Sequence, residues 1–154
     1  MKSKKWILLG ICSLLLQVNL IAQDKLNIKF GKISPADFDL SQQKFDSGAN
    51  AVIIADIGKT YFEGNQKSDM TMVYTRFMRV KILNKNGFDI AETKIGLYHN
   101  DQGDEEKLSD LKASTFNLEG GKVVETKLDD ISIFTEHHST QQDFKKFTLP
   151  ALRE

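Results

Sequence analysis

The sequence predicts a mostly-β domain, an antiparallel β-sandwich or curled sheet with one short N-terminal helix. Three observations support this fold class. Apolar and polar residues alternate along several stretches of strand length, glycine-containing turns separate these stretches, and only one short segment carries helix-start signals. Antiparallel strands joined by hairpins commonly expose one face to water, which accounts for the alternation. We therefore expect one domain with about seven strands.

The first 23 residues have the organisation of a secretory signal peptide. Three lysines precede an apolar run from Trp6 to Leu16, and a more polar stretch containing the small residue Ala22 follows. The apolar run has about eleven residues, well short of the ~20 that span a membrane. We expect cleavage after Ala22 or Gln23, export to the periplasm or the extracellular space, and a mature domain comprising residues 24–154.

Loss of the signal peptide changes the composition of the domain. It removes three lysines and no acid, which leaves 18 basic and 21 acidic side chains and a formal net charge of −3. The basic residues are scattered, so we expect no nucleic-acid partner, and no membrane contact after signal removal. Cys12, the only cysteine, leaves with the signal, so no disulfide is expected. A lipid anchor on Cys12 is disfavoured because Ile11 stands where a small residue is required.

Signals for one short helix appear at residues 34–40. The sequence Ser34-Pro35-Ala36-Asp37 places a hydroxyl at the N-cap, a proline at the first helical position and an acid in the first turn. These residues predict one or two helical turns ahead of the strands.

Two long strands are predicted next. Residues 51–57 form an apolar run interrupted only by Asp56, which predicts a strand buried on both faces that Gly58 bends or ends. Residues 60–63 continue as strand. Residues 70–83 form the longest stretch with β-like alternation.

A hairpin is predicted at Asn84-Lys85-Asn86-Gly87, because asparagine and glycine tolerate the positive φ of a tight turn. It joins the strand at 70–83 to a returning strand at 91–98. In this returning strand we expect Ala91, Thr93, Ile95 and Leu97 to face inward. Two of these residues, with two from the preceding strand, are expected to form a shared core: Ile95, Leu97, Val80 and Ile82.

A second hairpin and two final strands complete the predicted sheet. Glu119-Gly120-Gly121 separates strands at 108–118 and 122–128. Shorter strands are expected at 131–134 and 144–149. We expect the last of them to lie at an unpaired sheet edge, protected in part by the residues Lys145, Lys146 and Pro150.

The mature chain carries no recognisable catalytic motif. It has no cysteine for thiolate catalysis, and it lacks the Gly-x-Ser-x-Gly elbow, the phosphate-binding loop and the dinucleotide-binding glycine pattern. A Ser/His/Asp site assembled in space would have to use His99, His137 or His138, and no local pattern indicates one. We therefore predict a domain that is not an enzyme, with no catalytic or cofactor-binding residue.

Two clusters resemble metal-ligand sets without matching one. His137 and His138 lie near three acids, which could supply nitrogen and oxygen ligands: Asp129, Asp130 and Glu136. Adjacent strand residues point to opposite faces, so both imidazoles do not readily reach one ion, and we predict a solvated loop. A second group combines Gly103 with four acids: Asp101, Asp104, Glu105 and Glu106. Its spacing does not match a helix-loop-helix calcium site. The sequence predicts no bound metal or other cofactor.

Five segments carry a resemblance to a known family: ISPADFDL (33–40), FDSGANAVIIADIG (45–58), RVKILNKNG (79–87), KASTFNLEGGKVV (112–124) and KFTLP (146–150). They resemble the N-terminal β-rich domain of unknown function that precedes a transglutaminase-like, papain-related core in secreted bacterial proteins. The catalytic Cys/His/Asp set of that family belongs to the core, and no position of this chain matches it. The resemblance implies that further strands and the transglutaminase-like core follow residue 154.

The resemblance favours a non-catalytic accessory or interaction domain that positions, shields or presents substrate to a transglutaminase-like module. The alternative is a free-standing envelope module that binds protein or glycan. A metal-dependent hydrolase is the third possibility. The expected partner is accordingly a downstream transglutaminase-like domain, or an envelope protein or glycan. We also expect residues 24–154 alone to be marginally stable or prone to association.

Overall fold

The described chain consists mainly of antiparallel β-strands. The computed structural model describes residues 28–41, 44–64 and 70–153, so the signal peptide predicted at 1–23 lies outside the described residues. The elements are the 3-10 helix η1 (Pro35–Phe38), β1 (Ala51–Gly64), β2 (Met70–Ile82), the 3-10 helix η2 (Lys85–Ala91), β3 (Glu92–Tyr98), β4 (Ser114–Glu119), β5 (Lys122–Lys127), the 3-10 helix η3 (Asp130–Ser132), β6 (Phe134–Ser139) and β7 (Gln142–Thr148). Each strand pair among them is antiparallel. The predicted mostly-β, antiparallel fold class is confirmed.

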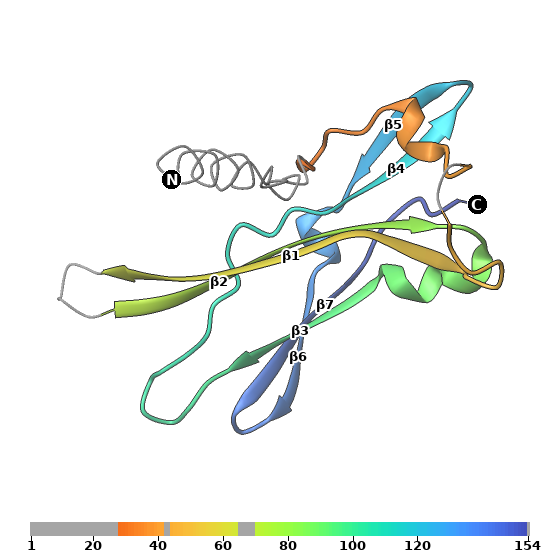
Figure 1. Cartoon of the computed structure of the whole chain (residues 1–154). Helices are drawn as coiled ribbons and strands as arrows, with labels where there is room; N and C mark the ends of the chain where they lie inside the picture. Colours follow the sequence, from red (N-terminus) through yellow and green to blue (C-terminus); the bar gives the residue numbers. More distant parts are fainter. Residues whose placement is uncertain (1–27, 42–43, 65–69, 154) are drawn as a thin grey trace, which may run out of the picture.

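The strands are divided among three sheets. β1 pairs with β2, β4 pairs with β5, and β7 lies between β3 and β6. In the view of Figure 1, β1 and β2 form a long two-stranded ribbon that extends past the other strands. The β3–β7–β6 sheet lies below this ribbon and the β4–β5 hairpin lies above it.

The predicted helix is a single turn, η1. The Asp37 carboxylate accepts hydrogen bonds from the backbone N–H of Ser34 at 2.7 Å and from the Ser34 hydroxyl at 2.7 Å. The hydroxyl and then the N–H of Ser34 lower the pKa of Asp37, because both hydrogen bonds favour the ionised carboxylate. Pro35 fills the first helical position, where no N–H is needed.

β1 is longer and more exposed than predicted. It continues through Gly58 to Gly64, and its irregularity lies instead at Ile54, where the pairing shifts between Ile53 and Ala55. Within β1 only Ala55 is buried. The prediction of burial on both faces is wrong, because this strand belongs to a two-stranded ribbon with one face open to solvent.

The hairpin predicted at residues 84–87 is also wrong. The Asn84 side chain accepts a hydrogen bond from the Asn86 N–H at 2.9 Å and thereby caps η2. This helix carries the chain away from β2, which pairs with β1, into a different sheet. Val80 and Ile82 are therefore not cross-strand neighbours of the two β3 residues expected to join them, Ile95 and Leu97.

The predicted alternation of β3 is confirmed although its partner is not. Thr93, Ile95 and Leu97 are half-buried, whereas the residues between them are exposed. The second predicted hairpin is confirmed as β4–β5, although its first strand begins at Ser114 and not at residue 108 as predicted. Gly120 and Gly121 have φ angles of 55° and 79°, the left-handed conformation that a two-residue hairpin loop requires.

The C-terminal strand is central, which contradicts the predicted sheet edge. β7 has β3 on one side and β6 on the other, and Phe147 within it is only 7% exposed. Residues 131 and 132 belong to the 3-10 helix η3, and the strand begins only at Phe134. His137 and His138 consequently lie in β6 and not in a loop.

The buried apolar core is small. Among the described residues, the buried hydrophobic side chains are Ala55, Ala91 and Phe147, and no large side chain is completely buried. The buried amide of Asn117 donates from Nδ2 to the Ala151 carbonyl at 2.8 Å, which ties the C-terminal segment to β4. Much of the apolar side-chain surface of this domain therefore remains open to solvent.

Candidate functional site

One face of the β1–β2 ribbon is apolar and open to solvent. The register places Thr60 opposite Tyr74 and Phe62 opposite Met72, and residues directly opposite each other share a face. Six large apolar side chains lie on this face and are 40% to 70% exposed: Ile53, Phe62, Met70, Met72, Tyr74 and Met78. We call these six residues the Met-rich face. Large exposed apolar side chains aligned on one face of this kind commonly mark an interaction site.

The middle of the Met-rich face is fixed by two local interactions. Gly58 leaves room for the ring of Tyr74, because a Cβ at Gly58 would lie 2.9 Å from the Tyr74 hydroxyl oxygen. Beside it, the Arg76 guanidinium donates two hydrogen bonds to the Asp56 carboxylate, at 2.7 and 2.6 Å. These hydrogen bonds lower the pKa of Asp56. The face therefore combines apolar side chains with one bidentate ion pair.

The base of the opposite face is covered by the N-terminal segment. Arg79 donates to the carbonyl oxygens of Lys29 at 2.8 Å and of Lys32 at 3.1 Å. The Lys81 ammonium donates to the Phe38 carbonyl and lies 5.2 Å from the centroid of the Phe38 ring. Partial burial lowers the pKa of Lys81. This covering is confined to the base of the opposite face, and Thr75, further along the same face of β2, is exposed.

A second candidate site lies on the β3–β7–β6 sheet, where two histidines and an aspartate meet. Asp143 of β7 is directly opposite Leu97 of β3 and His137 of β6, so these three side chains share one face. His99 follows Leu97 by two residues, and its N–H donates to the Gln141 carbonyl at 3.0 Å, so it continues on the same face. The register therefore brings His99, His137 and Asp143 together.

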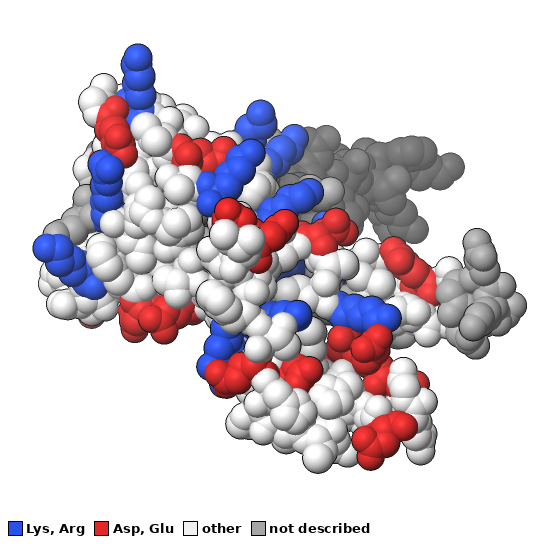
Figure 2. All heavy atoms as spheres, turned by 180° about the vertical axis from the view of Figure 1, so that it is seen from behind, with Lys and Arg blue, Asp and Glu red and all other residues white. Residues whose placement is uncertain are grey.

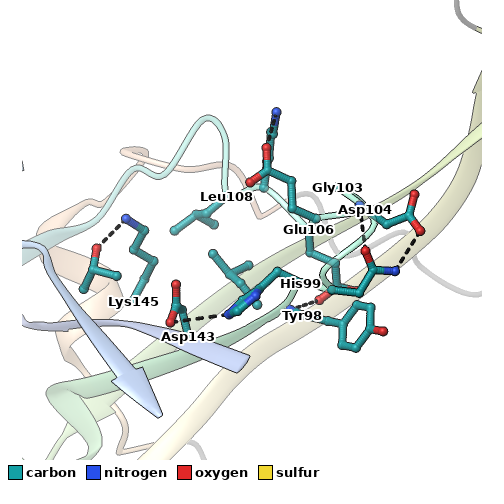
Figure 3. A pocket seen from close by; sticks show the side chains of 13 residues that line it. Tyr98, His99, Gly103, Asp104, Glu106, Leu108, Asp143 and Lys145 are labelled. Carbon is teal, nitrogen blue, oxygen red and sulfur yellow. Dashed lines mark hydrogen bonds and ion pairs between the residues drawn. The ribbon is translucent and has the colours of Figure 1, made fainter. Parts of the chain in front are cut away.

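The three side chains point toward one another. The distance from His137 Nδ1 to Asp143 Oδ1 is 2.8 Å, and that from His99 Nε2 to the same oxygen is 3.7 Å. One ligand atom from each of the three residues lies within 4.8 Å of the other two. His99 Nε2 is buried and has no hydrogen-bond partner. Figure 3 shows the imidazole of His99 facing the Asp143 carboxylate from the adjoining strand.

A cavity of about 750 Å³ adjoins this group. Its wall combines the sheet residues His99, Asp143 and Lys145 with the loop that follows β3. The loop is organised by the Asn100 side chain, whose Oδ1 accepts hydrogen bonds from the N–H groups of Gln102 and Asp104 at 2.9 Å each. Of the three residues in the group, His99 and Asp143 line this cavity.

The acidic loop itself does not form a cation site in the described structure. The Asp104 carboxylate accepts from Asn100 Nδ2 at 2.8 Å, Glu105 pairs with Lys107 at 2.7 Å, and Glu106 accepts from the Tyr98 N–H at 2.8 Å. These carboxylates are thus engaged with different partners. Among the described residues, the group with suitable spacing for a metal ion is the histidine–aspartate group.

The expectation that His137 and His138 face opposite ways agrees with their contacts. His138 lies on the other side of the sheet, where its ring centroid is 4.9 Å from that of Phe144. Sequence reasoning considered His99 only as a potential catalytic base and did not connect it with His137. The alternation of β3 predicts that His99 shares a face with Leu97, but its proximity to His137 depends on the pairing of β3 and β6 with β7, which no local pattern indicates.

Charge is mixed on the surface seen in Figure 2. Acidic and basic side chains are interspersed on that face, with broad uncharged areas between them and no continuous basic stripe among its described residues. Among the described residues, no helix is long and apolar enough to span a membrane.

Known proteins supply no assignment for either site. Comparison of the chain with models of protein families, with curated proteins and with solved structures found no match in any of the three. The resemblance to a domain that precedes transglutaminase-like cores therefore stays a prediction, and any function has to be inferred from the two sites themselves.

Proposed function

We propose that this chain is a non-catalytic interaction domain that docks on a protein partner through the Met-rich face. The observation that carries the proposal is the alignment of six exposed apolar side chains on one face of a ribbon. Methionine and aromatic residues are enriched at protein interfaces, and flexible methionine side chains adapt to the surface of a partner. The small buried core supports the same conclusion, because docking would bury further apolar surface.

The partner is a transglutaminase-like domain of an exported protein, as the family resemblance suggests. In this role the domain positions or shields the enzyme and contributes no catalytic residue. The signal peptide predicted at residues 1–23 supports this pairing, because it would export this chain to the periplasm or the outside of the cell, where an exported partner would also be. A free-standing envelope module that binds protein or glycan is the competing function, and the test below separates the two.

The test begins with a photo-crosslinking amino acid placed at Met72 in cells that express the native chain. Thr75 serves as the matched control position, because it is exposed on the opposite face of the same strand. We expect irradiation to link position 72, but not position 75, to a protein whose peptides identify a transglutaminase-like domain.

The captured domain is then purified, and its affinity is measured with Met72→Lys/Tyr74→Lys and with Thr75→Lys. We expect the double variant to weaken binding by about thirtyfold or more, because truncated interface anchors cost about 2 kcal/mol or more. The Thr75→Lys chain should bind like the parent. Equal capture from both positions, or binding to glycans without any protein partner, would refute the proposed function.

A further inference from the structure

We infer that His99, His137 and Asp143 form a binding site for one divalent transition-metal ion, with Zn²⁺ as the best fit. Two imidazoles and one carboxylate are ligands that Zn²⁺ accepts, and three protein ligands leave a fourth position for water or another small ligand. The site does not involve the Met-rich face, so a failure of this inference would leave the proposed docking function untouched, and the converse also holds.

The spacing of the ligand atoms is suited to such an ion. Ligands at the Zn–N and Zn–O distances of 2.0–2.2 Å lie about 3.3–3.6 Å apart around a tetrahedral centre. The separations here are 2.8 Å for His137 and 3.7 Å for His99, each measured to Asp143 Oδ1. The first separation has to lengthen by about 0.5 Å and the second is already close to the tetrahedral value, whereas the two histidine nitrogens lie within 4.8 Å of each other. Side-chain torsions of the exposed His137 would supply the adjustment.

The burial of one atom of His99, Nε2, supplies an independent indication, although the side chain as a whole is 30% exposed. Its Nε2 is buried without a hydrogen-bond partner, and an unsatisfied buried polar atom is costly. A metal ion between the three residues would give this nitrogen a partner. It would also replace the single hydrogen-bonding contact between His137 Nδ1 and Asp143 with coordination by both residues.

The backbone pairing of three strands positions the three proposed ligands. The ligands come from β6, from β7 and from the residue that follows β3, and β7 lies between the other two strands. Strand pairing fixes Asp143 opposite His137, and the hydrogen bond from His99 N–H to Gln141 continues the pairing past β3. The ligands are therefore positioned by rigid strands, and the ion would join all three.

The fourth coordination position would face the cavity beside the sheet. Lys145 lies on the same face of β7 as Asp143, two residues further on, and its ammonium donates to Thr135 at 2.6 Å. A small anion or a water molecule in the cavity could thus reach both the ion and a cationic side chain.

The test titrates the untagged chain, purified after export, with ZnCl₂ by calorimetry after dialysis against a chelator. We expect saturable binding of one Zn²⁺ per chain and a higher thermal midpoint in its presence, because a ligand that binds the folded state stabilises it. Co²⁺ should bind at the same site and give the visible absorption bands of a tetrahedral complex. Ca²⁺ should not compete, because it prefers oxygen ligands.

Two single variants test the two histidine ligands, and a third serves as a control. His99→Ala and His137→Ala should each weaken Zn²⁺ binding by more than about tenfold, the scale on which metal sites respond to lost ligand interactions. His138→Ala is the matched control, because His138 adjoins His137 but lies on the other face beside Phe144. It should bind Zn²⁺ like the parent.

The folding of each variant is checked by circular dichroism without metal. If His99→Ala does not fold, His137→Ala still tests the site, because His137 is exposed and its truncation should leave the fold intact. The inference is overturned if the parent chain binds no Zn²⁺ saturably, if Ca²⁺ displaces it, or if His138→Ala weakens binding as much as His137→Ala does.

Discussion

Single residues in this domain reveal where the backbone of one segment meets that of another. Gly87 is the clearest case, because a Cβ at this position would lie 2.4 Å from the Asn50 carbonyl oxygen. Gly87 was expected to permit a turn. In the structure it permits close approach of η2 to the residue that precedes β1.

We predict that Gly87→Ala destabilises the domain by about 1–3 kcal/mol, the usual cost of overpacking a close contact. The obstacle is backbone, which cannot rotate away as a side chain would. Gly64→Ala is the control, because a Cβ there meets nothing within 4 Å. Chemical denaturation of both variants provides the measurement, and equal stabilities would contradict the prediction.

At the scale of elements, two arginines of β2 have opposite roles although they are three residues apart. The Arg79 side chain is 16% exposed and ties the N-terminal segment to the ribbon through two backbone carbonyls. The Arg76 side chain is 53% exposed and pairs with Asp56 on the Met-rich face. The first joins two elements, whereas the second remains within one ribbon.

We predict that Arg79→Ala lowers the free energy of unfolding by about 1.5–3 kcal/mol, because hydrogen bonds from a charged, largely buried donor are lost. Arg76→Ala should change it by less than about 1 kcal/mol, since exposed ion pairs contribute little. Hydrogen exchange should accelerate at residues 29–38 in Arg79→Ala and stay unchanged in Arg76→Ala. The reverse order of effects would show that the N-terminal segment is held by other contacts.

The molecule as a whole has little buried apolar volume for its number of strands. Three separate sheets leave the Met-rich face and other apolar side chains in contact with solvent, while the buried hydrophobic residues of the described chain are three. The expectation of marginal stability therefore rests on the division of the strands among three sheets. It does not follow from the predicted unpaired terminal strand, because β7 is paired on both sides.

We predict that the free energy of unfolding of the isolated chain is less than about 5 kcal/mol, the lower end of the usual range. We also expect the chain to self-associate as its concentration rises. Static light scattering across a dilution series measures the association. Met72→Lys/Tyr74→Lys should reduce it by charging the Met-rich face, whereas Thr75→Lys should not. A chain that stays monomeric at every concentration, with high stability, would contradict this expectation.

The sequence by itself determined the local features of this protein. Alternation predicted the strand content and the inward side of β3, Ser34 and Asp37 predicted a capped turn, and Gly120-Gly121 predicted the β4–β5 hairpin. These features depend on residues close together in the chain. Short sequence patterns predict the φ preferences and hydrogen bonds of such residues.

Only the tertiary structure decided which strands pair and which side chains meet. The Asn86-Gly87 pattern suits a hairpin turn and also suits the 3-10 helix that separates β2 from β3, so local preference could not choose between them. The pairing of β3 with β7 joins residues such as Leu97 and Asp143, and that pairing brings His99 to His137. Contacts this distant along the chain depend on the register of whole strands, which no short motif specifies. A slip of one residue would move every side chain of a strand to the other face of the sheet.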